Sequence, residues 1–281
     1  MAGQGRDAVT PLRTVGTFIR GRACSDTLLN VLSCAYEHPL PDEERAAQAF
    51  AGGLMQRGHQ CGMVWGAALA AGAEAHRRLG DTPRAGALAI AAARRLLETF
   101  RAQNGAVDCY DITEIDEEST TLDLVTHFLL KGGVVRCFAG AARYASAAKE
   151  AIDAALAAPP EGAPLPTVSC AALLARRMGA SGLHAVMVAG FAGGIGLGGG
   201  GCGALGAAIW LTGVRALQGG AARVDFQSPE GRAVTERFLA STGGEFECAA
   251  ICGRTFANVE DHAAYLRGGG CAPLLQALAA G

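Results

Sequence analysis

The order of hydrophobic and polar positions along the chain is typical of helices rather than of strands. Stretches rich in alanine and leucine alternate with short breaks that contain glycine, proline or charged residues. In the first half these stretches predict helices over residues 42–51, 63–79, 83–102, 121–131 and 138–156. In the second half a helix is expected to begin at Ser228-Pro229 and to run toward Leu239. No stretch shows convincing strand alternation, so the predicted fold class is all-α.

One glycine–cysteine pattern occurs twice. Residues 50–53 read Phe-Ala-Gly-Gly, and seven further residues precede Cys61. Residues 191–194 repeat these four letters, and again seven residues precede Cys202. Both copies continue with a glycine, small residues and a tryptophan. The sequence therefore predicts one helical module written twice.

The correspondence continues along both copies. Cys109 and Cys248 each follow a phenylalanine and a glycine-containing break, and Cys137 and Cys271 each follow a leucine, a basic residue and glycines. Upstream, Cys170 has two candidate counterparts. Cys24 opens a good helix and leaves room for a full helix before Phe50, whereas Cys34 lies in a Ser-Cys-Ala triplet that copies the surroundings of Cys170. We favour Cys24 and leave Cys34 as the alternative.

A proline-rich segment separates the copies. Residues 159–166 contain four prolines, which cannot form a helix and are typical of a semi-rigid linker. The expected architecture is two tandem, pseudo-symmetric helical-bundle units, residues 1–155 and 167–281, joined by a linker over 156–166.

Composition and charge exclude some classes of function. The net charge is −2 with no basic run, so nucleic-acid binding has no electrostatic footprint. Residues 1–22 carry charges throughout and lack an apolar core, so we predict no export signal and a cytoplasmic location. Residues 183–217 are apolar enough to suggest a membrane span, but four consecutive glycines, Gly198 to Gly201, would break it. We therefore predict no membrane span.

The ten cysteines are the candidate chemistry. In a reducing compartment they are expected to be ligands or redox thiols rather than a disulfide framework. The predicted ligand set has four members in each unit: Cys24, Cys61, Cys109 and Cys137, then Cys170, Cys202, Cys248 and Cys271. Each lies at or near a predicted helix end, so a bundle could bring the four ends together. Free cysteines otherwise act as small buried hydrophobes.

Cys61 and Cys202 have the clearest predicted mechanism. Each follows a glycine-rich turn and precedes a helix, where backbone N–H groups and the helix dipole favour the thiolate. Glycines also let a backbone approach a bulky ligand closely, and Gly201, Gly203 and Gly206 are the predicted cofactor-binding residues.

Residues 201–206, Gly-Cys-Gly-Ala-Leu-Gly, with one cysteine before them and two after, resemble the motif of the C_GCAxxG_C_C family of redox-active proteins. The resemblance implies a module of about half this length with four characteristic cysteines, and it covers the chain twice. Gly203 stands where the family has alanine, which we expect to be a mild change. In the first copy Trp65 stands at the place of Gly206, and Gly66 follows one residue late. The resemblance therefore implies a divergent site in the first copy.

Several residues have no assigned role. Cys252 lies four residues after Cys248, on the same predicted helix face. It could be a fifth ligand, a resolving thiol or a cysteine without a role, and the sequence does not rank these. His59 is predicted to be a solvated loop residue and His184 a core or surface residue. His127 and His262 precede the last cysteine of each copy at similar intervals.

Three functions fit these features. The first is a redox protein with an iron–sulfur or related metal centre that transfers electrons, because four thiolates per unit match the needs of such a cluster. The second is thiol–disulfide chemistry with cycling pairs such as Cys109 and Cys137. The third is structural zinc in an interaction module. A redox partner protein is expected, its identity is unknown, and homo-oligomerisation is left open.

Overall fold

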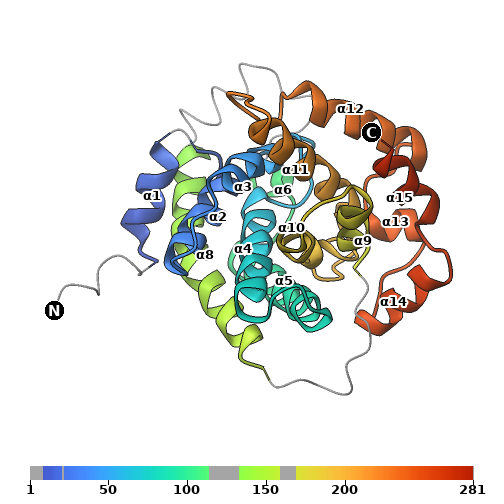
Figure 1. The fold of residues 1–281 in the computed structure, drawn as a ribbon. Coiled ribbons are helices and arrows are strands. Elements are labelled where there is room, and N and C mark those ends of the chain that lie inside the picture. Colours follow the sequence, from blue (N-terminus) through green and yellow to red (C-terminus); the bar gives the residue numbers. More distant parts are fainter. Residues whose placement is uncertain (1–8, 21, 114–132, 159–168, 281) are drawn as a thin grey trace.

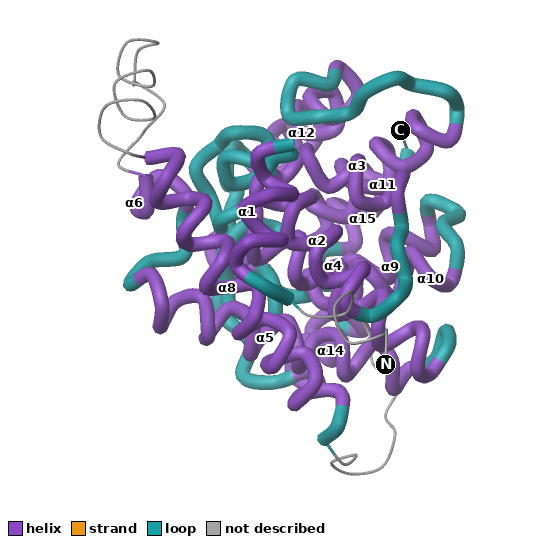
Figure 2. The backbone as a smooth tube through the Cα atoms, turned by 90° about the vertical axis from the view of Figure 1, so that its left-hand side faces the viewer, coloured by secondary structure: helices purple, strands orange, loops and turns teal. Residues whose placement is uncertain are grey.

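The computed structural model describes residues 9–20, 22–113, 133–158 and 169–280, with side chains described from residue 136 in the third range. Within these ranges the chain is helical and contains no β-strand, which confirms the all-α prediction (Figures 1 and 2). The only extended pairing among these residues is two isolated bridges, Gln60 with Asp108 and Gly201 with Glu247.

The first half forms a bundle around α4 and α5. Its elements are α1 (Pro11–Ile19), α2 (Cys24–Ala35), α3 (Pro41–Ala46), the 3-10 turn η1 (Ala47–Phe50), α4 (Gly62–Leu79), α5 (Pro83–Asn104), α6 (Cys109–Thr113) and α8 (Gly133–Leu156). Four of the five predicted helices are present, with bounds that shift by a few residues. The fifth, over residues 121–131, lies outside the described residues, as does His127.

The second half repeats much of this order with shorter helices. Its elements are α9 (Cys170–Arg177), α10 (Gly182–Met187), η3 (Val188–Phe191), α11 (Gly203–Gln218), α12 (Pro229–Thr242), α13 (Cys248–Cys252), α14 (Val259–Arg267) and α15 (Ala272–Ala279). The predicted helix start at Pro229 is confirmed. The prolines of residues 159–166 lie outside the described residues.

Helix ends follow ordinary capping chemistry. The Thr82 hydroxyl accepts a hydrogen bond from the backbone N–H of Ala85 at 3.2 Å, Pro83 occupies the first turn of α5, and Gly105 ends that helix in a left-handed conformation. Ser169 caps α9 in the same way as Thr82 caps α5. These local signals fix where the cysteine-bearing helices begin.

The two halves share one continuous hydrophobic core. The helix α4 packs on both α10 and η3, and α11 packs on α3 (Figure 1). At the centre, the Phe50 and Phe191 rings meet edge to face with centroids 5.7 Å apart. Trp65 stacks on Phe50 at 5.1 Å and meets Phe191 at 4.7 Å. Burial of these rings ties the two halves together.

Trp65 and Gly206, which occupy matching places in the two copies, fit each other. A side-chain carbon added to Gly206 would collide with the Trp65 ring. The indole therefore fills the space that glycine leaves free on α11. Packing explains why Trp65 stands where the family pattern has glycine. The large indole meets Gly206, which has no side chain, at the place where the two halves join.

The glycine-rich loops form left-handed turns. Residues 52–56 and 193–197 all have positive φ, although Leu54 and Ile195 carry side chains that rarely adopt this conformation. Each turn is closed by matching bonds: Leu54 N–H donates to the Phe50 carbonyl and Ile195 N–H to the Phe191 carbonyl, both at 3.1 Å. The turns reverse the chain immediately before Cys61 and Cys202.

The apolar stretch 183–217 is divided among α10, η3, the left-handed turn and α11. In the described part of the chain, no helix combines the length and the apolar character that crossing a membrane requires.

Candidate redox site

Four thiols of the first half gather into what we call the first cluster: Cys24, Cys61, Cys109 and Cys137. Cys24 opens α2, Cys61 precedes α4, Cys109 opens α6, and Cys137 lies in the first turns of α8. The Cys61 thiol hydrogen-bonds Cys24, and Cys24 interacts electrostatically with Cys109 and Cys137. Four separate helix ends thus bring their sulfurs to one region.

The left-handed turn helps to hold this cluster. The backbone of Gly52 hydrogen-bonds the Cys24 sulfur. Gly62 allows the approach of α2, since a carbon added there would lie 2.8 Å from both the Cys24 sulfur and the Phe50 carbonyl oxygen. The glycines predicted to permit close approach therefore admit the cysteine of a neighbouring helix.

Five thiols of the second half gather into the second cluster: Cys170, Cys202, Cys248, Cys252 and Cys271. The Cys252 sulfur lies 3.9 Å from that of Cys248 and 3.8 Å from that of Cys271. Cys170 and Cys202 interact electrostatically with Cys252 and are buried. The fifth thiol, Cys252, is the member that joins the others.

The backbone around the clusters is the same in both halves. Cys61 N–H donates to the Val107 carbonyl at 2.8 Å, as Cys202 N–H donates to the Phe246 carbonyl at 3.0 Å. The third cysteines, Cys109 and Cys248, likewise donate their N–H groups to residues just before Cys61 and Cys202, at 2.8 and 2.7 Å. Equivalent backbone bonds thus tie the third cysteine to the second. The tandem duplication itself stays a prediction.

In the first cluster the most acidic thiol is Cys24. The hydrogen bond from Cys61 lowers the pKa of Cys24, and the same bond, together with burial, raises the pKa of Cys61 well above its usual value. Burial raises the pKa of Cys109 to about 12 and that of Cys137 to about 11. Of these four thiols, Cys24 is the one whose pKa is lowered, and the pKa values of its three neighbours are raised.

In the second cluster the most acidic thiol is Cys252. Hydrogen bonds from Cys248 and Cys271 lower the pKa of Cys252, and the Tyr265 hydroxyl and the charge of His262 act in the same direction. Donating these bonds, together with burial, raises the pKa of Cys248 and of Cys271. Again one thiol accepts hydrogen bonds from the others.

The predicted role of Cys61 and Cys202 as the thiolates is therefore not what the structure favours. Both do precede a helix, and backbone groups of Ala204 and Leu205 lower the pKa of Cys202. Burial outweighs them and raises the pKa of Cys202 to about 12. A helix N-terminus promotes the thiolate only where the sulfur keeps contact with water or with a donor thiol.

The three glycines predicted to bind a cofactor lie against protein atoms. Added carbons would meet the Gln60 side chain at Gly201, the Phe191 carbonyl at Gly203 and the Trp65 ring at Gly206. Alanine at position 203, the residue usual in the family, would therefore clash, so glycine there is not the mild change expected. The observed role of these glycines is close packing, and cofactor binding stays a prediction.

The residues without an assigned role lie at different places relative to the two clusters. Cys34 lies ten residues after Cys24 on α2, about 15 Å along the helix axis. The His184 ring lies 2.9 Å from a Glu43 carboxylate oxygen, and His59 stacks on Phe246. The charge of His262 lowers the pKa of Cys252, so this histidine acts on a cysteine of the second cluster.

Two participants were missed by the sequence analysis. Tyr265 hydrogen-bonds Cys252, and nothing in the sequence pairs them. Thr113 is the last residue of α6, as Cys252 is of α13, and each lies four residues after the third cysteine of its half. The Thr113 hydroxyl donates to the Cys109 carbonyl at 2.6 Å. Aligning the sequences of the two short helices would have shown that Thr113 and Cys252 occupy matching positions.

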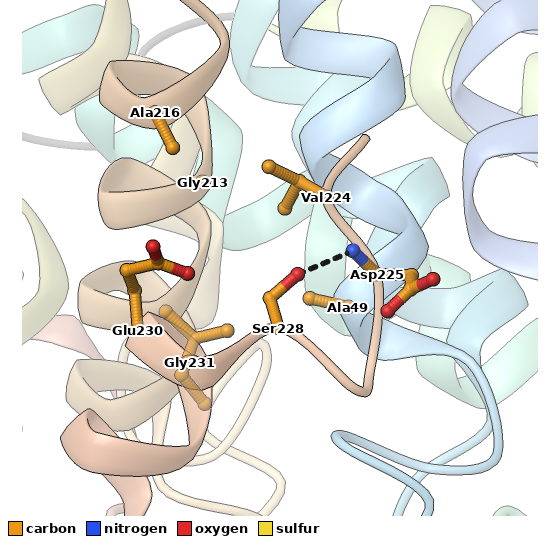
Figure 3. Close-up of a pocket in the computed structure, with 9 residues that line it drawn as sticks. Ala49, Gly213, Ala216, Val224, Asp225, Ser228, Glu230 and Gly231 are labelled. Atoms are coloured by element: carbon orange, nitrogen blue, oxygen red, sulfur yellow. Dashed lines mark hydrogen bonds between the residues drawn. The ribbon is translucent and has the colours of Figure 1, made fainter. Parts of the chain in front are cut away.

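Three cavities lie outside the clusters. The pocket of Figure 3 lies between η1, α11 and α12, where the Ser228 hydroxyl accepts a hydrogen bond from Asp225 N–H at 2.8 Å. Its free volume of about 10 Å³ is close to the minimum for one water molecule. Two larger depressions, of about 320 and 230 Å³, also lack a cysteine in their walls.

Residues 22–146 match the C_GCAxxG_C_C family, described as a putative redox-active protein. The match spans all four cysteines of the first cluster. It supports the resemblance and a redox role, but it covers the first half alone and leaves the second copy a prediction. In these comparisons no curated protein and no solved structure matches the chain.

Proposed function

We propose that this protein carries out its redox role through its two cysteine clusters, and that each cluster cycles between thiols and a disulfide. The observation that carries the proposal is the direct contact between thiols: the Cys252 sulfur lies within 4 Å of Cys248 on its own helix and of Cys271 from a separate element. Sulfurs at this separation need only a small side-chain movement to form a bond of about 2.05 Å.

The charge states support this chemistry. Thiol–disulfide exchange requires one thiolate to attack and a neighbouring thiol to complete the disulfide. Each cluster supplies one thiol with a lowered pKa, Cys24 or Cys252, in contact with a thiol whose pKa is raised, Cys61 or Cys271. No other nucleophile is needed at either cluster.

A metal centre is the second candidate, because four thiols from four elements are more than one disulfide requires and equal the ligand number of an iron–sulfur cluster. As they stand, the thiols do not fit this role. In the ranges the structure describes, no group of three or more His, Cys, Asp and Glu side chains is arranged to hold a metal ion. Metal binding would require the sulfurs to move and the buried thiols to release protons. Structural zinc meets the same obstacle.

One purification separates these candidates. We expect anaerobically purified protein to be colourless, free of stoichiometric iron, sulfide and zinc, and to lose about two thiols per cluster on mild oxidation. A brown protein with iron and sulfide would instead support the iron–sulfur centre, and zinc alone would support the structural site. If a metal centre is present, Cys202→Ser should impair the second cluster. Cys34→Ser should leave both clusters intact under either candidate, because Cys34 lies on a distant turn of α2.

A further inference from the structure

The second cluster holds one thiol more than the first. Cys252 ends α13, at the place that Thr113 occupies on α6, and it lies outside the four-cysteine pattern. Its sulfur contacts Cys248 at 3.9 Å and Cys271 at 3.8 Å, and it accepts a hydrogen bond from the Tyr265 hydroxyl. Cys252 thus has three neighbouring groups that can donate a hydrogen bond to its sulfur.

Exposure distinguishes the members of this cluster. Cys170, Cys202 and Cys248 are each only 5–6% exposed, whereas Cys252 and Cys271 are partly exposed. An external molecule can therefore reach the pair Cys252 and Cys271 before it reaches the others. Partial exposure is a general property of cysteines that react with external molecules.

The backbone of Cys271 supports this pairing. Cys271 precedes α15 in a left-handed conformation, with φ of 61°, which is unfavourable for a residue with a side chain. Cys248, in contrast, shares the single turn of α13 with Cys252 and lies on its buried side. The left-handed backbone places the Cys271 sulfur against Cys252 from a different element.

We propose that Cys252 is the attacking thiol of the second cluster, that Cys271 is its resolving partner, and that their substrate is an external disulfide. The inference rests on the proposed function and adds to it the reacting residues and the substrate class. It makes this partly exposed pair the point at which an external disulfide enters the second cluster.

The reaction is a two-electron exchange. The Cys252 thiolate attacks one sulfur of the external disulfide, forms a mixed disulfide and releases the other sulfur as a thiolate. The Cys271 thiol then attacks the Cys252 sulfur and releases the second external thiolate, which takes up the Cys271 proton. The thiolate released first takes up from solvent the proton that Cys252 lost on ionising. The external disulfide is thereby reduced to two thiols, and Cys252 and Cys271 are oxidised to an intramolecular disulfide.

The test uses reduced, full-length protein and glutathione disulfide as the probe, with peptide mass mapping as the readout. In the native protein we expect a Cys252–Cys271 disulfide and release of two glutathione thiols. In Cys271→Ser the mixed disulfide on Cys252 should accumulate, because its resolving partner is absent. Cys252→Thr, which copies Thr113, should slow the reaction of the second half by about tenfold or more.

The controls keep the two proposals distinguishable. Cys34→Ser should react as the native protein does, and near-native helical circular dichroism would show that Cys252→Thr is folded. If glutathione accumulates on another cysteine of the second cluster in Cys271→Ser, Cys252 is not the attacking thiol, although the clusters remain redox centres. If no cysteine of either cluster reacts, the proposed function fails as well.

Discussion

The two clusters have the same backbone and different thiol arrangements. In both halves a left-handed turn precedes the second cysteine, and the third cysteine is bonded to the loop before it. In the first cluster the accepting sulfur is Cys24, at the beginning of α2. In the second it is Cys252, at the end of α13, where the first half has Thr113. The comparison teaches that, within similar backbone surroundings, a cysteine or a threonine at the end of the short helix goes with a different accepting sulfur.

The largest effect on stability is expected at Trp65, where the first half has a tryptophan and the second half has Gly206. This side chain is fully buried between Phe50, Phe191 and Gly206. Trp65→Ala should lower the free energy of unfolding by about 3–5 kcal/mol, because it leaves a large cavity at the junction. Urea unfolding measures the loss.

A double-mutant cycle checks the fit between Trp65 and Gly206. Gly206→Ala alone should cost about 1–3 kcal/mol, since the added methyl group collides with the indole. In the Trp65→Ala background the same change should cost little. Additive losses would show that the two residues do not depend on each other.

The next effect concerns pH and is confined to the first half. Asp26 lies two residues after Cys24, and Ala172 stands at the matching place after Cys170. Burial raises the pKa of Asp26 from 3.8 to about 6, although Gln48 and Arg22 oppose the rise. Its protonated form therefore stabilises the fold below about pH 4, and this stability is lost as the pH rises through about 6.

Asp26→Asn should remove this dependence. Relative to the variant, the native protein should lose up to about 3 kcal/mol of unfolding free energy between pH 4 and pH 7. Asp42→Asn, at an exposed carboxyl that is 41% accessible, is the matched substitution at the protein surface. Parallel profiles for the native protein and Asp26→Asn would contradict the assignment.

A smaller effect compares the glycines that follow the second cysteines. Gly62 and Gly203 face the carbonyl groups of Phe50 and Phe191 so closely that an added methyl group would clash. Each alanine variant should lower the unfolding free energy by about 1–3 kcal/mol. Gly86→Ala, where the nearest atom would lie 3.9 Å away, should instead raise it by about 0.5–1 kcal/mol. Equal stability of all three variants would argue against the close packing described for the turns.

The all-α fold and most helix bounds followed from the sequence, because capping residues and alanine-rich stretches act locally. The four predicted cysteines of each half also lie near one another, as their positions at or near predicted helix ends led us to expect. The left-handed turns could not be predicted, since Leu54 and Ile195 adopt their conformation only because the surrounding bonds hold it. The accepting thiols were likewise hidden, because burial and contacts between distant segments, rather than helix position, set their acidity.

The smallest effect is expected from transferring the fifth thiol to the first half. Thr113→Cys would place a sulfur four residues after Cys109 on α6, as Cys252 follows Cys248 on α13. The reaction of the first half with glutathione disulfide should become faster by less than about tenfold, because the barrier changes by less than about 1.4 kcal/mol. Thiol release monitored over time gives the rate, and Thr113→Ser serves as the matched control. A slower reaction would mean that the new thiol disturbs Cys109 instead of joining the cluster.

The most direct test of the account is a map of the disulfides that form when the reduced protein is mildly oxidised. The account predicts bonds within each cluster, Cys24 with Cys61 and Cys252 with Cys271, while Cys34 stays reduced. Bonds that join the two clusters, a bond to Cys34, or thiols that all resist oxidation would contradict it.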